Sequence, residues 1–313
     1  MDTKWRRLTA AGVAAGILTG ICAPTAQAEA SDQTPNQSTT AASDIAGGKD
    51  PDGSVPPAGS DDWTCQPTAA HPRPVVLVHG TWANQNDWNM LAPQLKSEGY
   101  CVFSLNYGRD TSSVLGTIPG MYGVADIRVS AKELAAFVDR VRAATHAAKV
   151  DLVGHSQGAL MSRQYLRFEG GADKVGRLIS LAGTNHGSAM RGVAGLLPAG
   201  SAYSGFSAGL AGIAGTAAAQ QLVGSDFLQA INAAGDTDPG VSYTVLASTF
   251  DDASTPPQAT FLQAGPGATV DNVWVQDFCR TDTFEHATLP QSPTVAYIIK
   301  KALDPAYTGI PCP

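Results

Sequence analysis

The stretch that decides the fold is residues 148–160, AKVDLVGHSQGAL, where an apolar run ends in GHSQG (154–158) and then turns helical. Residues 150–153 have the pattern of a short buried strand, and residues 160–168 have that of a helix. A Gly-x-Ser-x-Gly sequence between a strand and a helix is typical of the nucleophile elbow, a strained turn that lifts the serine hydroxyl clear of the sheet. Ser156 is therefore a candidate nucleophile, and a turn serine without chemistry is the alternative.

The rest of the chain alternates strand and helix patterns. The expected strands are residues 73–78, 100–107, 175–182, 241–250 and 269–276. The expected helices are residues 86–99, 125–145 and 293–303. This alternation predicts an α/β fold with a mostly parallel, doubly wound sheet covered by helices on both faces. Such sheets bind ligands at the carboxyl ends of their strands, and Ser156 lies at such an end.

Residues 187–240 interrupt this alternation. The segment is dense in Ala and Gly with scattered large apolar residues, and it follows directly on an expected strand. One interpretation is a helical cap or lid-like insertion whose apolar side faces an acyl pocket. The other interpretation is an ordinary pair of helices packed on the sheet, and the sequence favours neither.

The N-terminal part of the chain has the pattern of an export signal followed by a leader. Basic residues precede an uncharged apolar stretch and a small-residue cleavage site, which predicts a secretory signal peptide over residues 1–28. The pair Arg6-Arg7 leaves twin-arginine export open. Residues 29–62 have too few apolar side chains to offset the entropy of ordering, so we expect a disordered leader, and then a catalytic domain over residues 63–313. The mature protein is expected to be secreted and extracellular.

The charge balance excludes some classes of partner. The full chain has a formal net charge of −7, and removal of residues 1–28 leaves 17 basic residues (20 less three) against 26 acidic ones (27 less one), a net charge of −9. An acidic chain of this kind has no electrostatic footprint for nucleic acid. We therefore expect no nucleic-acid partner and no binding through a basic surface to anionic membranes.

Four cysteines remain after the predicted cleavage: Cys65, Cys101, Cys279 and Cys312. An even number in an exported chain indicates disulfides, and four cysteines allow three connectivities. Proximity in sequence alone favours the pairs 65 with 101 and 279 with 312. We expect no metal at these cysteines, because no pair has the Cys-x-x-Cys spacing.

A serine nucleophile needs a base within hydrogen-bond reach and an acid that orients the base. In sheets that carry a serine elbow, the chain order is Ser, then Asp or Glu, then His. His186 and His286 are the histidines that follow Ser156, and His186 precedes any suitable acid. We therefore predict that His286 is the base and that Asp251, at the end of an expected strand, is the acid.

The neighbouring candidates fit less well. Asp252 lies one residue beyond the strand end, and Asp277 and Asp282 have the setting of exposed loop charges. His79 and His155 are more typical of structural hydrogen bonding and packing than of catalysis.

Two backbone N–H groups are expected to hold a developing oxyanion. Gln157 begins a helix, so its N–H has no intrahelical acceptor. The second donor is expected in the loop after the strand at residues 73–78, where Thr81 N–H is the best candidate.

Residues 73–303 resemble the secreted bacterial triacylglycerol lipases of the α/β-hydrolase superfamily, in the class 2 lipase group. The matching pieces are PVVLVHGT at 74–81, GYCVF at 99–103, NYG at 106–108, GHSQG at 154–158, TNHG at 184–187, Asp251, VQDFC at 275–279 and His286. The resemblance implies an α/β-hydrolase fold and hydrolysis of carboxylic esters, preferentially of acylglycerols. It implies no cofactor and no metal, and its His-Gly-Thr loop resembles that of enzymes for medium to long acyl chains.

Other functions use the same residues. A polyester or cutin hydrolase, a small-ester carboxylesterase and an acyltransferase to alcohols or sugars are the alternatives among enzymes. A secreted binding protein that keeps the fold without the chemistry is the alternative from another class. The presence of Ser156, Asp251 and His286 together favours the enzyme, and transient contact with a lipid interface is a further expectation for a lipase.

Overall fold

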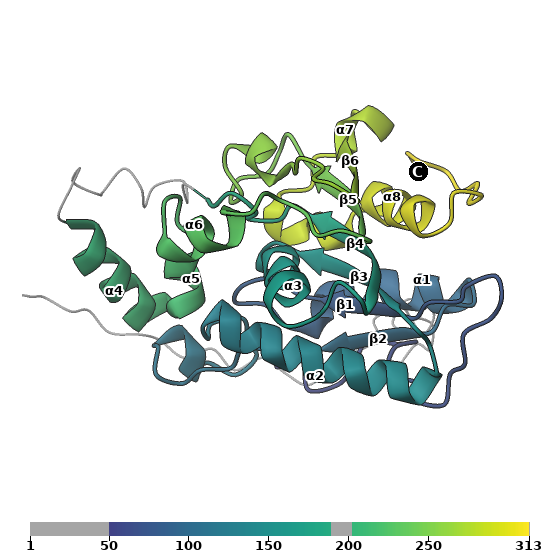
Figure 1. The fold of residues 1–313 in the computed structure, drawn as a ribbon, viewed down its shortest axis with the longest axis horizontal. Coiled ribbons are helices and arrows are strands. Elements are labelled where there is room, and N and C mark those ends of the chain that lie inside the picture. The colour runs from purple at the N-terminus through teal and green to yellow at the C-terminus, as the bar shows by residue number, and fades with distance from the viewer. Residues whose placement is uncertain (1–49, 189–201, 313) are drawn as a thin grey trace, which may run out of the picture. The chain divides into compact units, whose positions relative to one another are not determined.

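The computed structural model describes residues 50–188 and 202–312, and the described strands form one parallel sheet in the order β2-β1-β3-β4-β5-β6 (Figure 1). The strands are β1 (Val75–Val78), β2 (Val102–Leu105), β3 (Val150–His155), β4 (Val175–Leu181), β5 (Ser242–Ala247) and β6 (Thr269–Trp274). The chain runs outward from β1 to β2 and then crosses to the other side of β1, which makes the sheet doubly wound. The predicted fold class is confirmed. The predicted signal peptide, most of the predicted leader and part of the candidate cap lie outside the described residues.

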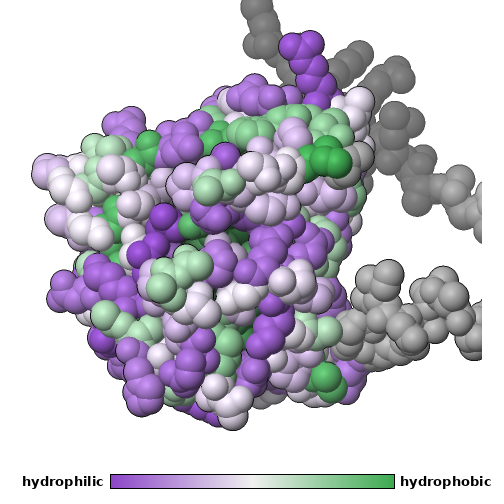
Figure 2. All heavy atoms as spheres, turned by 90° about the vertical axis from the view of Figure 1, so that its right-hand side faces the viewer, coloured by the Kyte–Doolittle hydropathy of each residue, from purple (hydrophilic) through white to green (hydrophobic). Residues whose placement is uncertain are grey.

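Helices cover both faces of the sheet because side chains alternate along each strand. The covering helices are α1 (Leu91–Ser97), α2 (Ile127–Thr145), α3 (Gln157–Phe168) and α8 (Pro293–Leu303). Val76 packs with α2 and α3 into one hydrophobic core, and its neighbour Val75 packs with α1 and α8 into the other. On the side that carries α8, polar residues predominate and strongly hydrophobic ones are scattered (Figure 2).

The helix expected over residues 86–99 is divided in two. A 3-10 turn, η1 (Gln85–Trp88), comes first, and its N-cap Asn84 accepts from the backbone N–H of Asn86 at 2.9 Å. The α-helix then begins only at Leu91. Pro93 explains this start, since a proline has no N–H to donate and fits an α-helix only in its first turn. Helical spacing of apolar residues runs through both pieces and does not reveal the break.

Residues 187–240 contain three described helices, α4 (Ala202–Ala214), α5 (Thr216–Gln220) and α6 (Asp226–Asn232). Phe227 and Ile231 of α6 pack into the core that contains α3, as ordinary covering helices do. Ile213, near the end of α4, is 60% exposed. In the described part of the chain, no helix is both long enough and apolar enough to span a bilayer.

Residues 50–62, the end of the segment expected to be a disordered leader, lie against the domain. Ser60 forms a parallel bridge with Val102 at the outer edge of β2. Nearer the start of this segment, Gly53 O accepts a hydrogen bond from the Gln85 side chain at 2.7 Å. Hydrogen bonds from residues distant in sequence hold this piece, so its polar composition does not reveal the contact.

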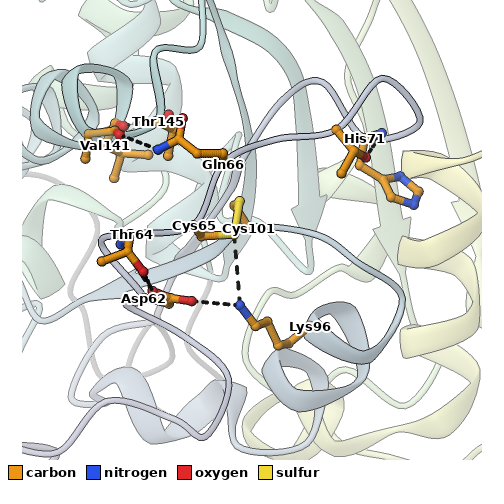
Figure 3. Close-up of a disulfide and its surroundings, with 11 residues drawn as sticks. Asp62, Thr64, Cys65, Gln66, His71, Lys96, Cys101, Val141 and Thr145 are labelled. Carbon is orange, nitrogen blue, oxygen red and sulfur yellow. Dashed lines mark hydrogen bonds and ion pairs between the residues drawn. A yellow bond between two sulfur atoms is a disulfide. The ribbon is translucent and has the colours of Figure 1, made fainter.

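Two disulfides join Cys65 to Cys101 and Cys279 to Cys312, the pairing favoured from the sequence. The first connects the segment before β1 to the residue that precedes β2. Figure 3 shows Lys96 of α1 beside this bridge, where its ammonium donates to Asp62 at 3.0 Å. The bridge and the ion pair therefore attach the same segment to the domain.

Removal of this first bridge is expected to destabilise the domain without changing its chemistry. The double variant Cys65→Ser, Cys101→Ser loses a link between residues 36 apart in sequence. Because the unfolded chain then gains entropy, we expect the free energy of unfolding to fall by about 2 to 4 kcal/mol. Urea denaturation followed by tryptophan fluorescence measures the change, and an unaltered midpoint would contradict the prediction.

Candidate active site

Ser156 lies at the turn between β3 and α3. Its backbone angles, φ 54° and ψ −124°, are unfavourable for a residue with a side chain. The Ser156 N–H donates to Leu181 O at 2.9 Å, which holds the turn against β4. Gly158 is required beside it, because a Cβ there would clash with the carbonyl groups of Val78, the last residue of β1, and His79, which follows it. The elbow is thus fixed by close contact of α3 with the sheet.

The predicted nucleophile, base and acid form one chain of hydrogen bonds. His286 Nε2 lies 2.8 Å from Ser156 Oγ, and His286 Nδ1 lies 2.9 and 3.1 Å from the two carboxylate oxygens of Asp251. A carboxylate only accepts, so Nδ1 carries the proton and Nε2 is free to accept from the serine hydroxyl. Asp251 Oδ1 also accepts from the N–H groups of Ala253 and Ser254, at 2.9 and 2.8 Å. These bonds fix the carboxylate.

The other acids lie elsewhere. Asp252 is exposed, and its carboxylate accepts from the backbone N–H of His286 at 3.3 Å, not from the ring. Asp277 is exposed in α7 (Val275–Phe278), as expected. Asp282 differs from the expectation of an exposed loop charge: it is buried and accepts from the hydroxyl of Ser292, the N-cap of α8. Asp282 is buried because it holds the hydroxyl of this N-cap residue, which lies ten positions away in sequence.

The two residues predicted to supply oxyanion donors lie in contact. Gln157 Nε2 donates to Thr81 Oγ1 at 3.0 Å and to Gly123 O at 2.7 Å. Gln221 Nε2 donates to the same threonine oxygen at 2.9 Å, and Gln221 Oε1 accepts from the Thr184 hydroxyl at 2.9 Å. Two buried amides therefore hold the side chain of Thr81. The orientation of the loop that contains it depends on α3 and on the segment after α5.

His79 lies behind this loop in a neutral form. Its Nδ1 donates to Gly80 O at 2.8 Å, and its Nε2 accepts from Tyr107 N–H at 3.4 Å. Complete burial lowers the pKa of His79 to about 4, because the charged ring would lose its hydration. The ring also stacks on Tyr107, with centroids 4.3 Å apart. These contacts are structural, in agreement with the interpretation made from the sequence.

A pocket of about 850 Å³ opens above Ser156 at the carboxyl ends of the strands. Its described lining includes Thr81, Trp82, Asp87, Ser188 and Gln221 beside Ser156 and His286. Sequence reasoning missed Asp87 and Gln221, since no spacing rule connects them with the elbow. The one signal that could have indicated Gln221 is its place as a polar residue in an Ala-rich segment. Within residues 50–188 and 202–312, no group of three or more His, Cys, Asp or Glu could hold a metal ion.

His186, which the expected chain order excluded as the base, belongs to a separate cluster. Its Nε2 lies 3.0 Å from Asp236 Oδ1, and its Nδ1 lies 2.8 Å from Ala259 O. The hydrogen bond to Asp236 raises the pKa of His186 above its ordinary value, against the effect of burial. Burial raises the pKa of Asp236, but the bonds from His186 and Gln263 N–H bring it below its ordinary value. The pair joins the loops after β4, α6 and β5.

This pair predicts a pH-dependent contribution to stability. Because the folded pKa of His186 is raised, its contribution is complete below its unfolded pKa, near 6.5, and is lost as the pH rises through the folded value. We expect His186→Gln to lower the free energy of unfolding more at about pH 5.5 than at about pH 9. Urea denaturation at both pH values tests this. An equal loss at both would contradict it.

Comparison with protein families gives one match over most of the chain. The family model Lipase (class 2) matches residues 72–289. A triacylglycerol lipase of Pseudarthrobacter phenanthrenivorans is 37% identical over 101 residues, which is 30% of this chain and 28% of that protein. A triacylglycerol lipase of Burkholderia plantarii is also 37% identical over 101 residues, 30% of this chain and 25% of that protein. The matched segment is thus about a quarter of each relative.

Solved structures support the same fold. Lipase B of Aspergillus fumigatus superposes with a TM-score of 0.60 at 19% identity, over 79% of this chain and 55% of that chain. The mature lipase BlEst2 of Bacillus licheniformis superposes with a TM-score of 0.53 at 21% identity, over 76% of this chain and 94% of that chain. At such identities the likeness establishes the α/β-hydrolase fold alone. With the family match over residues 72–289, it follows that the chain belongs to the class 2 lipase family.

Proposed function

We propose that this protein is a lipase-like carboxylic ester hydrolase that acts on acylglycerols through an acyl group on Ser156. The observation that carries the proposal is the unbroken chain of hydrogen bonds from Ser156 Oγ through His286 to Asp251, at the floor of a pocket. A hydroxyl is a poor nucleophile at neutral pH, and this arrangement removes its proton as it attacks. The names of the related lipases support the substrate class.

In the proposed acylation step, Ser156 Oγ bonds to the ester carbonyl carbon while its proton moves to His286 Nε2. The carbonyl π electrons move onto oxygen, and the backbone N–H groups of Thr81 and Gln157 stabilise the resulting oxyanion. Asp251 stabilises the imidazolium that forms. When the intermediate collapses, the bond to the alcohol oxygen breaks and His286 returns the proton to that oxygen.

Deacylation repeats these steps with water. The oxygen of a water molecule attacks the acyl carbon while His286 accepts a proton from that water. When the second intermediate collapses, the bond from the acyl carbon to Ser156 Oγ breaks and His286 returns the proton to this oxygen. One ester and one water give one acid and one alcohol, so the cycle needs no cofactor. Transfer to an alcohol in place of water is the acyltransferase alternative, which product analysis separates.

In the proposed domain organisation, α4 belongs to a cap that contacts the oxyanion loop. The indole N–H of Trp82, beside Thr81, donates to Ala214 O at the end of α4 at 2.7 Å. This bond connects the oxyanion loop to the segment interpreted as a cap and supports that interpretation for α4. The signal-peptide pattern over residues 1–28 and the two disulfides support secretion into an oxidising compartment.

A small-ester carboxylesterase is the second candidate. The observation in its favour is that Thr81, Thr184, Ser188 and Gln221 add polar groups to a described lining whose other part is apolar, with Trp82, Ala253 and Ala287. A long acyl chain would gain less from such a surface than from an aliphatic one.

Hydrolysis rates over an ester series test the proposal. The purified protein is assayed with p-nitrophenyl esters from acetate to stearate and with emulsions of tributyrin, trioctanoin and triolein. A lipase is expected to release acid from the emulsified long-chain substrates, and a rate that rises above the solubility limit supports a mobile cap. Cleavage confined to dissolved acetate and butyrate esters favours the carboxylesterase, and no cleavage of any ester contradicts the enzyme.

A further inference from the structure

A third histidine and aspartate pair, His155 and Asp87, lies beside the proposed catalytic residues. His155 precedes Ser156 and is buried, and its ring centroid lies 5.0 Å from that of His286. His155 Nε2 lies 3.0 Å from the backbone oxygen of His286, and His155 Nδ1 lies 3.2 Å from Asp87 Oδ2. No step of the proposed reaction uses this pair.

Both groups that face the His155 ring are acceptors. A backbone carbonyl and a carboxylate have no proton to give, so both ring nitrogens donate when both bonds are made. Asp87 Oδ2 lies beside His155 Nδ1 and orients that edge of the ring. The direction of the bond to His286 is therefore fixed: His155 donates and the His286 carbonyl accepts.

The His286 carbonyl accepts a hydrogen bond from a side chain outside its own helix. His286 begins the 3-10 helix η5 (His286–Gln291), and the N–H of Leu289 bonds to Glu285 O. The next residue along, Pro290, has no N–H to donate. His155 Nε2 is the side-chain donor that reaches the first carbonyl of this helix, at 3.0 Å. The bond fixes the main chain of the proposed base.

Asp87 connects the same pair to two other loops. Its Oδ2 accepts from the N–H of Gly80, at the start of the oxyanion loop, at 3.3 Å, and its backbone oxygen accepts from Gln291 Nε2 at 3.4 Å. A Cβ on Gly80 would lie 3.1 Å from His155 Nδ1, so the loop and the ring are in close contact. The oxyanion loop, the elbow and the turn of His286 therefore meet at the His155–Asp87 pair.

We infer that His155, oriented by Asp87, is a positioning residue that holds the main chain of His286 so that Nε2 stays in reach of Ser156 Oγ. The inference rests on the proposed function. His155 exchanges no proton and forms no bond in the proposed steps, and it acts by fixing the geometry of His286. A misplacement of about 1 Å in a catalytic group can cost roughly a hundredfold in rate, so loss of the bond is expected to lower kcat and to leave KM nearly unchanged.

The test compares His155→Met with His155→Gln. The two side chains are similar in length, and only the glutamine amide can donate to the His286 carbonyl. Active-site titration with a fluorophosphonate gives kcat per competent site, so a partly unfolded preparation does not distort the comparison. We expect kcat to fall roughly a hundredfold in His155→Met and less than about tenfold in His155→Gln, with KM within about twofold of the wild type in both.

Equal losses in the two variants, or a wild-type kcat per titrated site in His155→Met, would overturn the inference. His186→Gln is the matched control, because it removes a histidine from another His–Asp pair outside the site, and it is expected to keep the wild-type kcat. If His155→Met does not fold, Asp87→Ala replaces it: a fall in kcat supports the inference and a wild-type kcat overturns it. Failure of the wild type to cleave esters would instead reject the proposed function.

Discussion

Ser156→Ala is expected to lower kcat for ester hydrolysis by a factor on the order of 10⁴ to 10⁶, with the protein still folded. The substitution removes the atom that bonds to the acyl carbon, and no other hydroxyl lies within hydrogen-bond distance of His286 Nε2 among the described contacts. Residual catalysis by the oxyanion donors and by substrate binding sets the lower limit of the rate.

Ser162→Ala is the matched control for this variant. Ser162 is buried in α3, the helix that begins directly after Ser156. Its hydroxyl donates to Gly158 O at 2.7 Å, and it does not belong to the described pocket lining. Both variants lose one hydroxyl from α3 or its N-cap, but only Ser156 faces the base. The two proteins are compared by their rates on the best ester of the series. Undiminished hydrolysis by Ser156→Ala would remove the serine from the mechanism.

Asp251→Asn is expected to lower kcat by roughly 10⁴ while the fold is kept. Asp251 Oδ1 accepts from the N–H groups of Ala253 and Ser254, and the amide oxygen of an asparagine would keep these bonds. Its NH₂ group would then face His286 Nδ1 and donate to it. The ring would carry its proton on Nε2 instead, where it could no longer accept the proton of Ser156.

The pH-independent part of kcat and the melting temperature check this prediction together. Asp277→Asn makes the same chemical change at an exposed position in α7 and is expected to leave both quantities unchanged. A kcat for Asp251→Asn within about tenfold of the wild type would contradict the role given to this carboxylate.

The sheet and the candidate triad follow from local patterns in the sequence. Strands β1, β2 and β3 each contain a short apolar run, and the elbow glycines mark the turn that Ser156 occupies. His286 and Asp251 follow from chain order and from their place after successive strands, a rule that reflects the parallel topology. These residues were predictable because the sheet brings all strand ends to one edge.

The contacts that support the site were not predictable in the same way. Gln221 meets Thr81 across 140 residues, and His155 meets the His286 carbonyl across 131. Such contacts depend on how helices and loops pack, and the spacing of apolar residues in the sequence does not indicate them. The same reason explains why residues 50–62 lie against the domain although their composition is that of a leader.

The central claim is that ester hydrolysis proceeds through Ser156, and covalent labelling tests it most directly. The wild-type protein is treated with a fluorophosphonate, and the modified peptide is identified by mass spectrometry while ester hydrolysis is followed in parallel. We predict one adduct, on Ser156, and a loss of hydrolysis in proportion to labelling, with no adduct in Ser156→Ala. Labelling at another residue, or hydrolysis that continues at full rate after Ser156 is fully modified, would contradict the account.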